Sequence, residues 1–330
     1  MVASEQFLQT VTDQMKLVRD EIGKVIVGHD DVVEGVIIAL VAGGHVLLEG
    51  VPGLGKTTLL RTLGSAMHLD DSRIQFTPDL MPADIVGSMV LEADSLGSKE
   101  LRFQPGPIFA HLVLADEINR ATPRTQSALL EAMQERTVTT GTTTHQLEDP
   151  FLVMATQNPL EMEGTYPLPE AQLDRFLLKL VVRYPTKQEM EEIVDRTMAP
   201  QSPVVHQVMD REQVLDARRG AHEVLIAPHV RDFAIRLILS TQPEREEAHA
   251  SAKKYIRYGS SPRGAQALIQ AGRVRSLMRG RLNVSLADLR ELALPALRHR
   301  IILNFDAHAE GKTADQVLNG IIESLPEGTR

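Results

Sequence analysis

The sequence predicts an α/β domain that is followed by a helical domain. An apolar run at 46–48 leads into a glycine-rich turn and a helical pattern, and a second apolar run at 112–114 ends in two acids. Buried strands that alternate with helices are typical of a parallel sheet flanked by helices. Strand patterns stop near residue 184, and helical periodicities follow. We therefore divide the chain into an α/β domain at 1–184 and an all-helical domain at 185–330.

The composition is that of an ordinary globular protein, and it excludes several kinds of site. Of the 330 residues, 43% are hydrophobic and 24% are charged, and cysteine is absent. Without cysteine the chain has no disulfide, no thiol nucleophile and no cysteine-ligated zinc. The formal net charge of -9 argues against broad, non-specific binding to nucleic acid, which depends on Lys and Arg meeting phosphates.

The sequence gives no indication of a membrane span or a secretory signal. Residues 1–6 lack the basic start and the following apolar run of a signal. The most apolar segment, 32–48, is interrupted by Glu34, two glycines and His45, and it is too short to span a bilayer. We therefore expect a cytoplasmic protein without membrane insertion.

Two helices are predicted before the first strand. Apolar residues recur every three or four positions from Phe7 to Ile22, which indicates an amphipathic helix. The next helix, 31–42, is apolar nearly all round, so we expect it to be buried. Gly43 and Gly44 end this helix, and the first strand follows.

The first strand leads into a phosphate-binding loop. Residues 50–57, GVPGLGKT, follow the pattern G-x-x-x-x-G-K-[ST] and lie between a strand and a helix, as that motif requires. Glycines let backbone N–H groups converge on phosphates, and the helix N-terminus adds a positive field. Lys56 can reach the β- and γ-phosphates, and the hydroxyl of Thr57 can bind Mg²⁺. The nucleotide-binding residues predicted here are Gly50, Pro52, Gly53, Leu54, Gly55, Lys56, Thr57 and Thr58.

Two β-hairpins are predicted within the nucleotide-binding domain. After a strand at 73–77, alternating pieces at 88–92 and 100–103 flank the turn residues 94–97, which indicates a hairpin insertion. A threonine-rich run around one glycine, 137–145, indicates a second hairpin.

Two acids follow the buried strand 112–114. In an open parallel sheet, ligands bind at the carboxyl ends of the strands, where the phosphate-binding loop also lies. Asp116 is therefore placed to hold Mg²⁺ through water, and Glu117 to polarise an attacking water as a general base. An isolated acidic pair would more often be a solvated strand end, but its position after a phosphate-binding loop favours the catalytic interpretation.

A third polar strand end is predicted at Asn158. The buried strand 151–155 runs into Thr156, Gln157 and Asn158, and an asparagine beside the acids could orient the lytic water. Taken alone, such an asparagine is more often a turn residue, so the prediction depends on its position. A cluster of acids and bases at 168–176 then precedes the strand 177–182.

Helices account for the rest of the chain. One of them begins with Arg263 in its first turn, where the helix dipole does not favour a cation. An anionic partner would explain this arginine. The predicted helices are 189–197, 211–225, 230–239, 263–278, 286–299 and 314–325.

Four segments in this order resemble the AAA+ ATPases and, within them, the MoxR family. Residues 50–57 resemble Walker A, 112–117 Walker B, 155–159 sensor 1 and 261–264 sensor 2. The resemblance covers nearly the whole chain. It implies a P-loop AAA+ domain with hairpin insertions like those of the clade that includes magnesium chelatase, followed by an all-helical lid domain. It also implies ATP and Mg²⁺ as the bound cofactors.

The resemblance also implies roles for single residues. Asn158 would be the sensor 1 residue, and Val27 with Gly28 would lie on the adenine side of the nucleotide. Arg175 would be an arginine finger inserted into the site of a neighbouring subunit, and Arg263 would touch the γ-phosphate as sensor 2. A salt bridge from Arg175 to an acid of its own chain, Asp174 or Glu170, is the alternative for the finger.

The implied function is that of a homo-oligomer, a hexameric ring, which hydrolyses ATP to remodel or mature a partner protein. A protein with a von Willebrand factor A domain is the implied partner, and the client stays unidentified. A motor subunit of a metal-chelatase-like complex is an alternative.

A DNA translocase is a weaker alternative. Residues 137–147 contain no Lys or Arg, whereas a hairpin that tracks phosphates should be basic or aromatic. An isolated phosphoryl-transfer kinase would leave Glu117, Asn158 and the helical domain without roles.

Overall fold

A five-stranded parallel sheet forms the centre of the nucleotide-binding part. The computed structural model describes residues 5–93, 99–158, 164–201 and 203–326. The strand order in the sheet is β2-β5-β8-β1-β9, and all neighbouring strands run parallel. The predicted parallel sheet is therefore confirmed. Its strands are β1 (Val46–Glu49), β2 (Asp71–Gln75), β5 (Leu112–Asp116), β8 (Leu152–Gln157) and β9 (Leu178–Val181).

Helices cover both faces of this sheet. Alternate residues of a strand point to opposite faces, so Leu112 and Leu114 join one hydrophobic cluster while Val113 and Ala115 join another. The first cluster includes side chains of α1 (Glu5–Gly23), α2 (Asp30–Ala42) and α3 (Lys56–Met67). The second includes side chains of α4 (Pro82–Val86) and α5 (Pro123–Glu135). As predicted, α2 is buried along most of its length.

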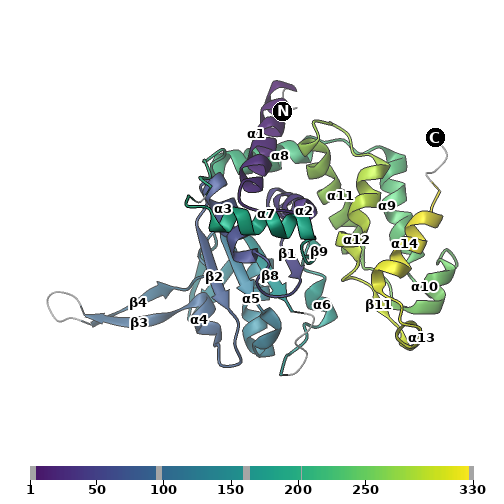
Figure 1. Cartoon of the computed structure of the whole chain (residues 1–330). Helices are drawn as coiled ribbons and strands as arrows, with labels where there is room; N and C mark the ends of the chain where they lie inside the picture. The colour runs from purple at the N-terminus through teal and green to yellow at the C-terminus, as the bar shows by residue number, and fades with distance from the viewer. Residues whose placement is uncertain (1–4, 94–98, 159–163, 202, 327–330) are drawn as a thin grey trace.

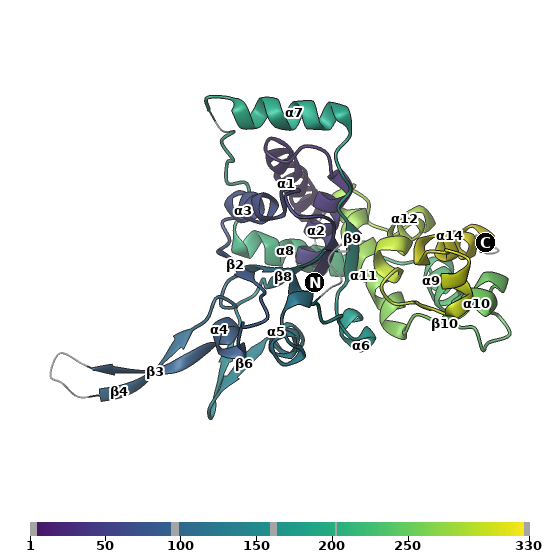
Figure 2. The ribbon, with the colours of Figure 1, turned by 60° about the horizontal axis from the view of Figure 1, so that its bottom comes forward.

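Both predicted hairpins are present and extend from the same side of the sheet domain (Figure 2). The longer one pairs β3 (Gly87–Ala93) with β4 (Lys99–Pro105), and the shorter one pairs β6 (Thr137–Thr140) with β7 (Thr143–Gln146). The predicted turn residues 94–97 lie outside the described residues.

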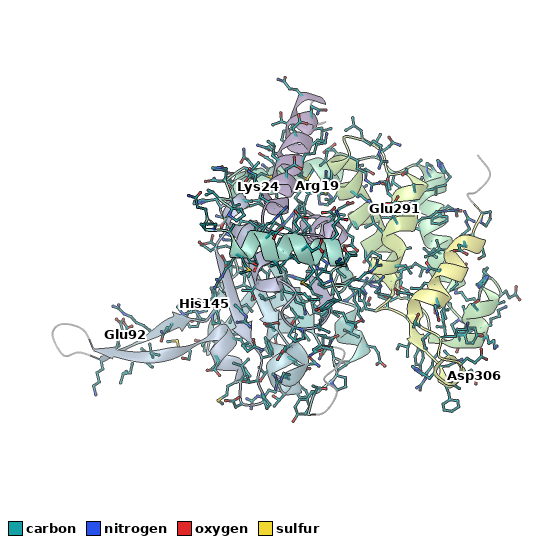
Figure 3. All side chains as sticks on the ribbon, viewed as in Figure 1. Arg19, Lys24, Glu92, His145, Glu291 and Asp306 are labelled. Carbon is teal, nitrogen blue, oxygen red and sulfur yellow. The ribbon has the colours of Figure 1, made fainter. Side chains whose placement is uncertain are left out.

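The two hairpins meet near the body of the protein. The ring of Phe103 on β4 stacks on that of His145 on β7, with 4.0 Å between the ring centroids. Figure 3 shows His145 close to the sheet domain and Glu92 farther out along the longer hairpin.

The C-terminal part is helical, as predicted, apart from a small two-stranded ribbon. The ribbon pairs β10 (Ile256–Tyr258) with β11 (Ile302–Leu303). Two short helices were not predicted, because α10 (Ala250–Tyr255) and α13 (Phe305–Ala309) are too short for a helical period to appear. The longer helices are α9 (Pro228–Ser240), α11 (Pro262–Met278), α12 (Leu286–Leu297) and α14 (Ala314–Ser324).

Three further helices flank β9 in the chain: α6 (Glu170–Leu173) precedes it, and α7 (Lys187–Met198) and α8 (Arg211–Glu223) follow it. Helix α8 packs against α1 and α2 as well as against α11. The hydrophobic cluster on one face of the sheet continues into α9, α11, α12 and α14. The helices of the C-terminal part, α9 to α14, are called the lid below. They lie beyond the β9 edge, on the side away from the β3–β4 hairpin (Figure 1). The proposed boundary at residue 184 stays a prediction.

Candidate functional site

The phosphate-binding loop lies between β1 and α3 and depends on three glycines. Gly53 and Gly55 have φ angles of +83° and +75°, a backbone region that residues with a Cβ rarely adopt. Gly50 is needed for a different reason, since a Cβ there would lie 2.7 Å from the carbonyl oxygen of Val182. The first turn of α3 begins at Lys56, so its unpaired N–H groups face the loop.

This loop forms one wall of a pocket of about 390 Å³. The pocket brings the loop together with both predicted acids and the predicted asparagine, which come from the carboxyl ends of β5 and β8. Its size falls in the range of small-molecule sites. The lining residues are Gly50, Pro52, Gly53, Gly55, Lys56, Thr57, Thr58, Arg73, Gln75, Asp116, Glu117, Thr156 and Asn158.

Lys56 is held at the floor of the loop. Its Nζ donates a hydrogen bond of 2.6 Å to the carbonyl oxygen of Gly50. Burial lowers the pKa of Lys56, while the negative charges of Asp116 and Glu117 act in the opposite direction. A phosphate oxygen could replace the Gly50 carbonyl as the partner of this ammonium group, because each offers an acceptor.

Thr156 positions the two acids relative to each other. Its hydroxyl donates to Asp116 Oδ1 at 2.7 Å and accepts from the backbone N–H of Glu117 at 2.8 Å. Glu117 has a φ of +56°, which is uncommon for a residue with a side chain. Strain of this kind is typical of functional sites. The bond to Thr156 therefore helps to hold Glu117 in an unusual backbone conformation at the end of β5.

Three side chains that the sequence analysis missed bind these acids. Arg73 NH2 donates to Asp116 Oδ2 at 2.6 Å, and Gln75 Nε2 donates to Glu117 Oε2 at 3.1 Å. Arg120 NH1 also donates to Glu117 Oε2, at 2.9 Å. Arg73 and Gln75 come from β2, which lies beside β5 in the sheet. The sequence did contain a signal for them: Arg73 and Gln75 occupy alternate positions of a short strand, so both side chains point to the same side of the sheet.

The donor set in the pocket fits Mg²⁺. Thr57 supplies a hydroxyl and Asp116 a carboxylate, and both line the same space. Mg²⁺ prefers oxygen ligands, keeps several of its waters and often binds through one or two carboxylates together with substrate phosphates. In the part of the chain that the structure describes, no group of three or more His, Cys, Asp or Glu side chains could hold a metal ion by itself.

Arg175 and Arg263 do not line this pocket. They line a second cavity, of about 290 Å³, at the opposite ends of the strands. This second cavity, the arginine cavity, includes Gly43, Gly44 and His45, which precede β1, whereas the phosphate-binding loop follows β1. The four residues of β1 separate the two sites by roughly 13 Å, at about 3.3 Å per residue.

Arg175 does not form the salt bridge that was the alternative to a finger. Its NH1 donates to the carbonyl oxygen of Leu130 on α5, at 2.7 Å. Asp174 instead pairs with Arg300, at 2.8 Å. The side chain of Arg263 is 50% exposed and lies 3.9 Å from Asp174.

Three predicted nucleotide residues lie outside the lining of both cavities. Leu54 is half-buried and packs against the main hydrophobic cluster. Val27 is buried between α1 and α2, and Gly28 beside it has a φ of +67°. A Cβ on Gly28 would lie 2.6 Å from a carboxylate oxygen of Glu189 on α7. Contact of Val27 and Gly28 with an adenine stays a prediction.

The sequence matches two family descriptions, one over the phosphate-binding pocket and one over the later part of the helical region. Residues 45–178 match the ATPase family associated with various cellular activities (AAA), and residues 248–321 match the AAA lid domain. In the described part of the chain, no helix combines the length and the apolar character needed to cross a membrane.

Proteins and a solved structure of high similarity support the same assignment. Chaperone MoxR1 of Mycobacterium tuberculosis is 41% identical over 92% of this chain and 80% of its own length. Protein YeaC of Bacillus subtilis, which is uncharacterised, is 41% identical over 93% and 92%. Protein MoxR of Methylorubrum extorquens is 29% identical over 86% of both chains. A crystal structure of a Cytophaga hutchinsonii protein, provisionally assigned as an ATPase, superposes with a TM-score of 0.91 at 40% identity, covering 98% of this chain and 97% of that one.

Proposed function

This chain belongs to the MoxR family of AAA+ ATPases, and from that premise we propose that it forms a ring whose ATP hydrolysis remodels a partner protein. Its general activity as an ATPase follows from the family. The proposal concerns how the ring hydrolyses ATP and what it acts on.

The pocket at the phosphate-binding loop supplies the groups for hydrolysis. Backbone N–H groups at the start of α3 bind the phosphates, and Lys56 neutralises charge on the β- and γ-phosphates. Thr57 and Asp116 would hold Mg²⁺, which would neutralise charge that develops on the phosphates. Glu117 accepts a proton from the attacking water, and Asn158 orients that water.

One observation carries the ring proposal: Arg175 and Arg263 lie at the opposite ends of the strands from the pocket of their own chain. An arginine that stabilises transition-state charge has to reach the γ-phosphate. If neither arginine can serve its own site, a neighbouring copy would supply both. Such a head-to-tail contact generates a closed ring when its rotation closes. A hexamer is the ring size that we propose.

The work of the ring would be done on a protein. Motion of the lid after hydrolysis would change the positions of the two hairpins relative to a bound partner. In the described part of the longer hairpin, the two cations Lys99 and Arg102 are balanced by the two acids Glu92 and Glu100, so positive charge is not in excess. Arg102 also pairs with both acids, at 3.6 Å and 3.3 Å. A surface of this kind favours a protein client over DNA, which needs unpaired cations along its path.

The partner class stays a family-level proposal. We propose a protein with a von Willebrand factor A domain as the partner, in the cytoplasm, and an assembly or maturation client beyond it. A metal-chelatase-like complex would use the same motor and would differ in the partner alone.

The test measures ATP turnover per subunit at a series of protein concentrations. Arg175→Ala and Arg263→Ala are measured in parallel with the parent protein. Arg219→Ala is a matched control, because this arginine on α8 is 64% exposed and pairs with Asp216 on the same helix. We expect turnover to rise steeply with concentration, both cavity variants to lose turnover while binding ATP, and the control to remain normal. Turnover independent of concentration, with normal activity of both cavity variants, would exclude a shared site.

A further inference from the structure

We propose that Asp174 is a positioning residue that fixes Arg175 and Arg263 relative to each other, so that both reach one phosphate of a neighbouring subunit. This inference rests on the proposed shared site, and it adds the group that aligns the two arginines. Asp174 directly precedes Arg175 in the chain, after the short helix α6. Figure 2 shows α6 between α5 and the helices of the lid.

The first link runs from Asp174 to the lid helix that carries Arg263. The hydroxyl of Ser261 donates to Asp174 Oδ2 at 2.8 Å. Ser261 is also the N-cap of α11, where its hydroxyl accepts from the backbone N–H of Arg263 at 3.2 Å. Asp174 Oδ2 therefore binds Ser261, the residue that caps the first turn of α11, and Arg263 lies in that turn.

The second link is Arg300, whose side chain is 3% exposed. Its Nε donates to Asp174 Oδ1 at 2.8 Å. The same guanidinium group donates to the carbonyl oxygens of Phe176, at 2.7 Å, and Leu177, at 3.1 Å. It also donates to the carbonyl oxygen of Asp174, at 3.3 Å. Arg300 follows α12, so these contacts tie the lid to the backbone on both sides of Arg175.

The two links use different oxygens of one carboxylate. Asp174 therefore connects the segment that carries Arg175 to the start of α11 and to Arg300, which follows α12. Both candidate arginines and Asp174 line the same cavity. A buried guanidinium that loses its partner carries a large desolvation cost, so Arg300 strongly favours the arrangement with Asp174 in place. If the lid moved away from α6, the contacts at Asp174 would break and the two arginines would separate. The carboxylate therefore makes the paired arrangement of the arginines depend on the position of the lid.

A purely structural bond between lid and sheet domain would show the same contacts, so the test must report on the neighbouring subunit. Asp174→Asn keeps the size of the side chain and removes the charge that Arg300 faces. We expect it to lower ATP turnover by about tenfold, the cost of misaligning charged groups in a transition state, with ATP binding changed less than twofold. Asp174→Glu, which keeps the charge, should recover part of the turnover.

The decisive measurement is complementation in mixed rings. Asp174→Asn is co-expressed with Glu117→Gln, each with its own tag, and complexes that carry both tags are assayed. The Asp174→Asn subunit supplies an intact Glu117, and the Glu117→Gln subunit supplies an intact arginine cavity. In a random head-to-tail ring about a quarter of the interfaces combine the two intact halves, so turnover should rise to about a quarter of the parent value. A defect confined to the variant's own pocket or fold would not be rescued.

A second pair of variants distinguishes a failure of the role proposed for Asp174 from a failure of the proposed shared site. Arg175→Ala co-expressed with Glu117→Gln tests the shared site alone. If that pair recovers turnover while the Asp174→Asn pair does not, the positioning role is wrong and the shared site stands. If neither pair recovers, the shared site itself is wrong, and the role of Asp174 with it. Should Asp174→Asn fail to fold, Ser261→Ala, which removes the link from Asp174 to α11 together with the N-cap hydrogen bond to Arg263, goes through the same complementation with the same criteria.

Discussion

The guanidinium group of Arg73 lies 2.6 Å from a carboxylate oxygen of Asp116, the residue that would hold Mg²⁺. A cation on β2 therefore already balances the charge of Asp116 before a metal binds. Arg73 also donates to Gln75, whose amide reaches Glu117, so both acids of the pocket are linked to β2.

Removal of this guanidinium should change how much Mg²⁺ the protein needs. In Arg73→Ala the metal no longer competes with an ion pair for Asp116, and we expect the Mg²⁺ concentration for half-maximal ATP binding to fall about fivefold, as for an ion pair worth about 1 kcal/mol. The measurement is a titration of fluorescent ATP analogue binding against Mg²⁺. Arg73→Lys keeps the charge and should behave like the parent. An unchanged Mg²⁺ requirement in Arg73→Ala would show that the pair does not compete with the metal.

Thr156 should matter for the rate more than for nucleotide binding. Thr156→Val has nearly the same shape but loses both the bond to Asp116 and the bond to the Glu117 backbone. We expect turnover to fall by about tenfold or more, because the general base loses its fixed position, while ATP affinity stays within about twofold. Thr156→Ser retains the hydroxyl and serves as the control. The two variants are compared by steady-state turnover and by equilibrium ATP binding; a valine variant with normal turnover would contradict the positioning role.

Substitution of Lys56 should impair ATP binding, whereas substitution of Glu117 should impair hydrolysis alone. Lys56→Ala removes a charge that faces the phosphates, so ATP binding should weaken to the point of being undetectable at micromolar nucleotide. Glu117→Gln keeps the size of the side chain and loses the base, so it should bind ATP normally and hydrolyse it about 10²–10⁴-fold more slowly. Calorimetric titration and phosphate release measure the two properties. Loss of binding in Glu117→Gln would mean that this residue holds the nucleotide rather than activates water.

Stability should fall below pH 6.5 because of two buried histidines. Burial, with the nearby Arg136, lowers the pKa of His45 to about 3, and burial with Arg300 lowers the pKa of His299 well below its usual value. The unfolded chain then binds protons that the folded chain does not, so the free energy of unfolding decreases as pH falls. From pH 7.5 to 5.5 His45 should contribute a loss of about 1 kcal/mol, and His299 acts in the same direction.

Urea unfolding at the two pH values measures this loss, and His45→Asn tests its source. His45 accepts from the backbone N–H of Val153 at 3.0 Å, and its other ring nitrogen lies 3.1 Å from the carbonyl oxygen of Met133. The variant should therefore be less stable at pH 7.5 but should lose about 1 kcal/mol less over the same pH range. An equal pH dependence in parent and variant would show that His45 does not titrate on unfolding.

The sequence predicted the parts of the site that a local pattern specifies. The loop at 50–57 and the acids after 112–114 were predicted because strand, turn and helix follow each other within a short stretch. Asn158 was predicted because the carboxyl ends of parallel strands meet at one edge of a sheet. The described pocket contains all of these groups together.

Other features needed the order of the strands in space. Arg73 and Gln75 reach the acids because β2 lies next to β5, a neighbour relation that no local pattern specifies. The position of Arg175 and Arg263 at the opposite ends of the strands depends on how α6 and the lid fold back. Short elements such as α10 and the β10–β11 ribbon have too few residues to show a period.

One hydrophobic cluster extends from α1 along one face of the sheet and into α9, α11, α12 and α14. The melting behaviour of the chain follows from this continuity. Two domains with separate cores could melt in two steps, whereas a core shared between them couples their unfolding into a single cooperative transition. A fragment that ends near residue 184 would expose the apolar face of α2 that α11 covers, so we expect it to aggregate rather than to fold alone.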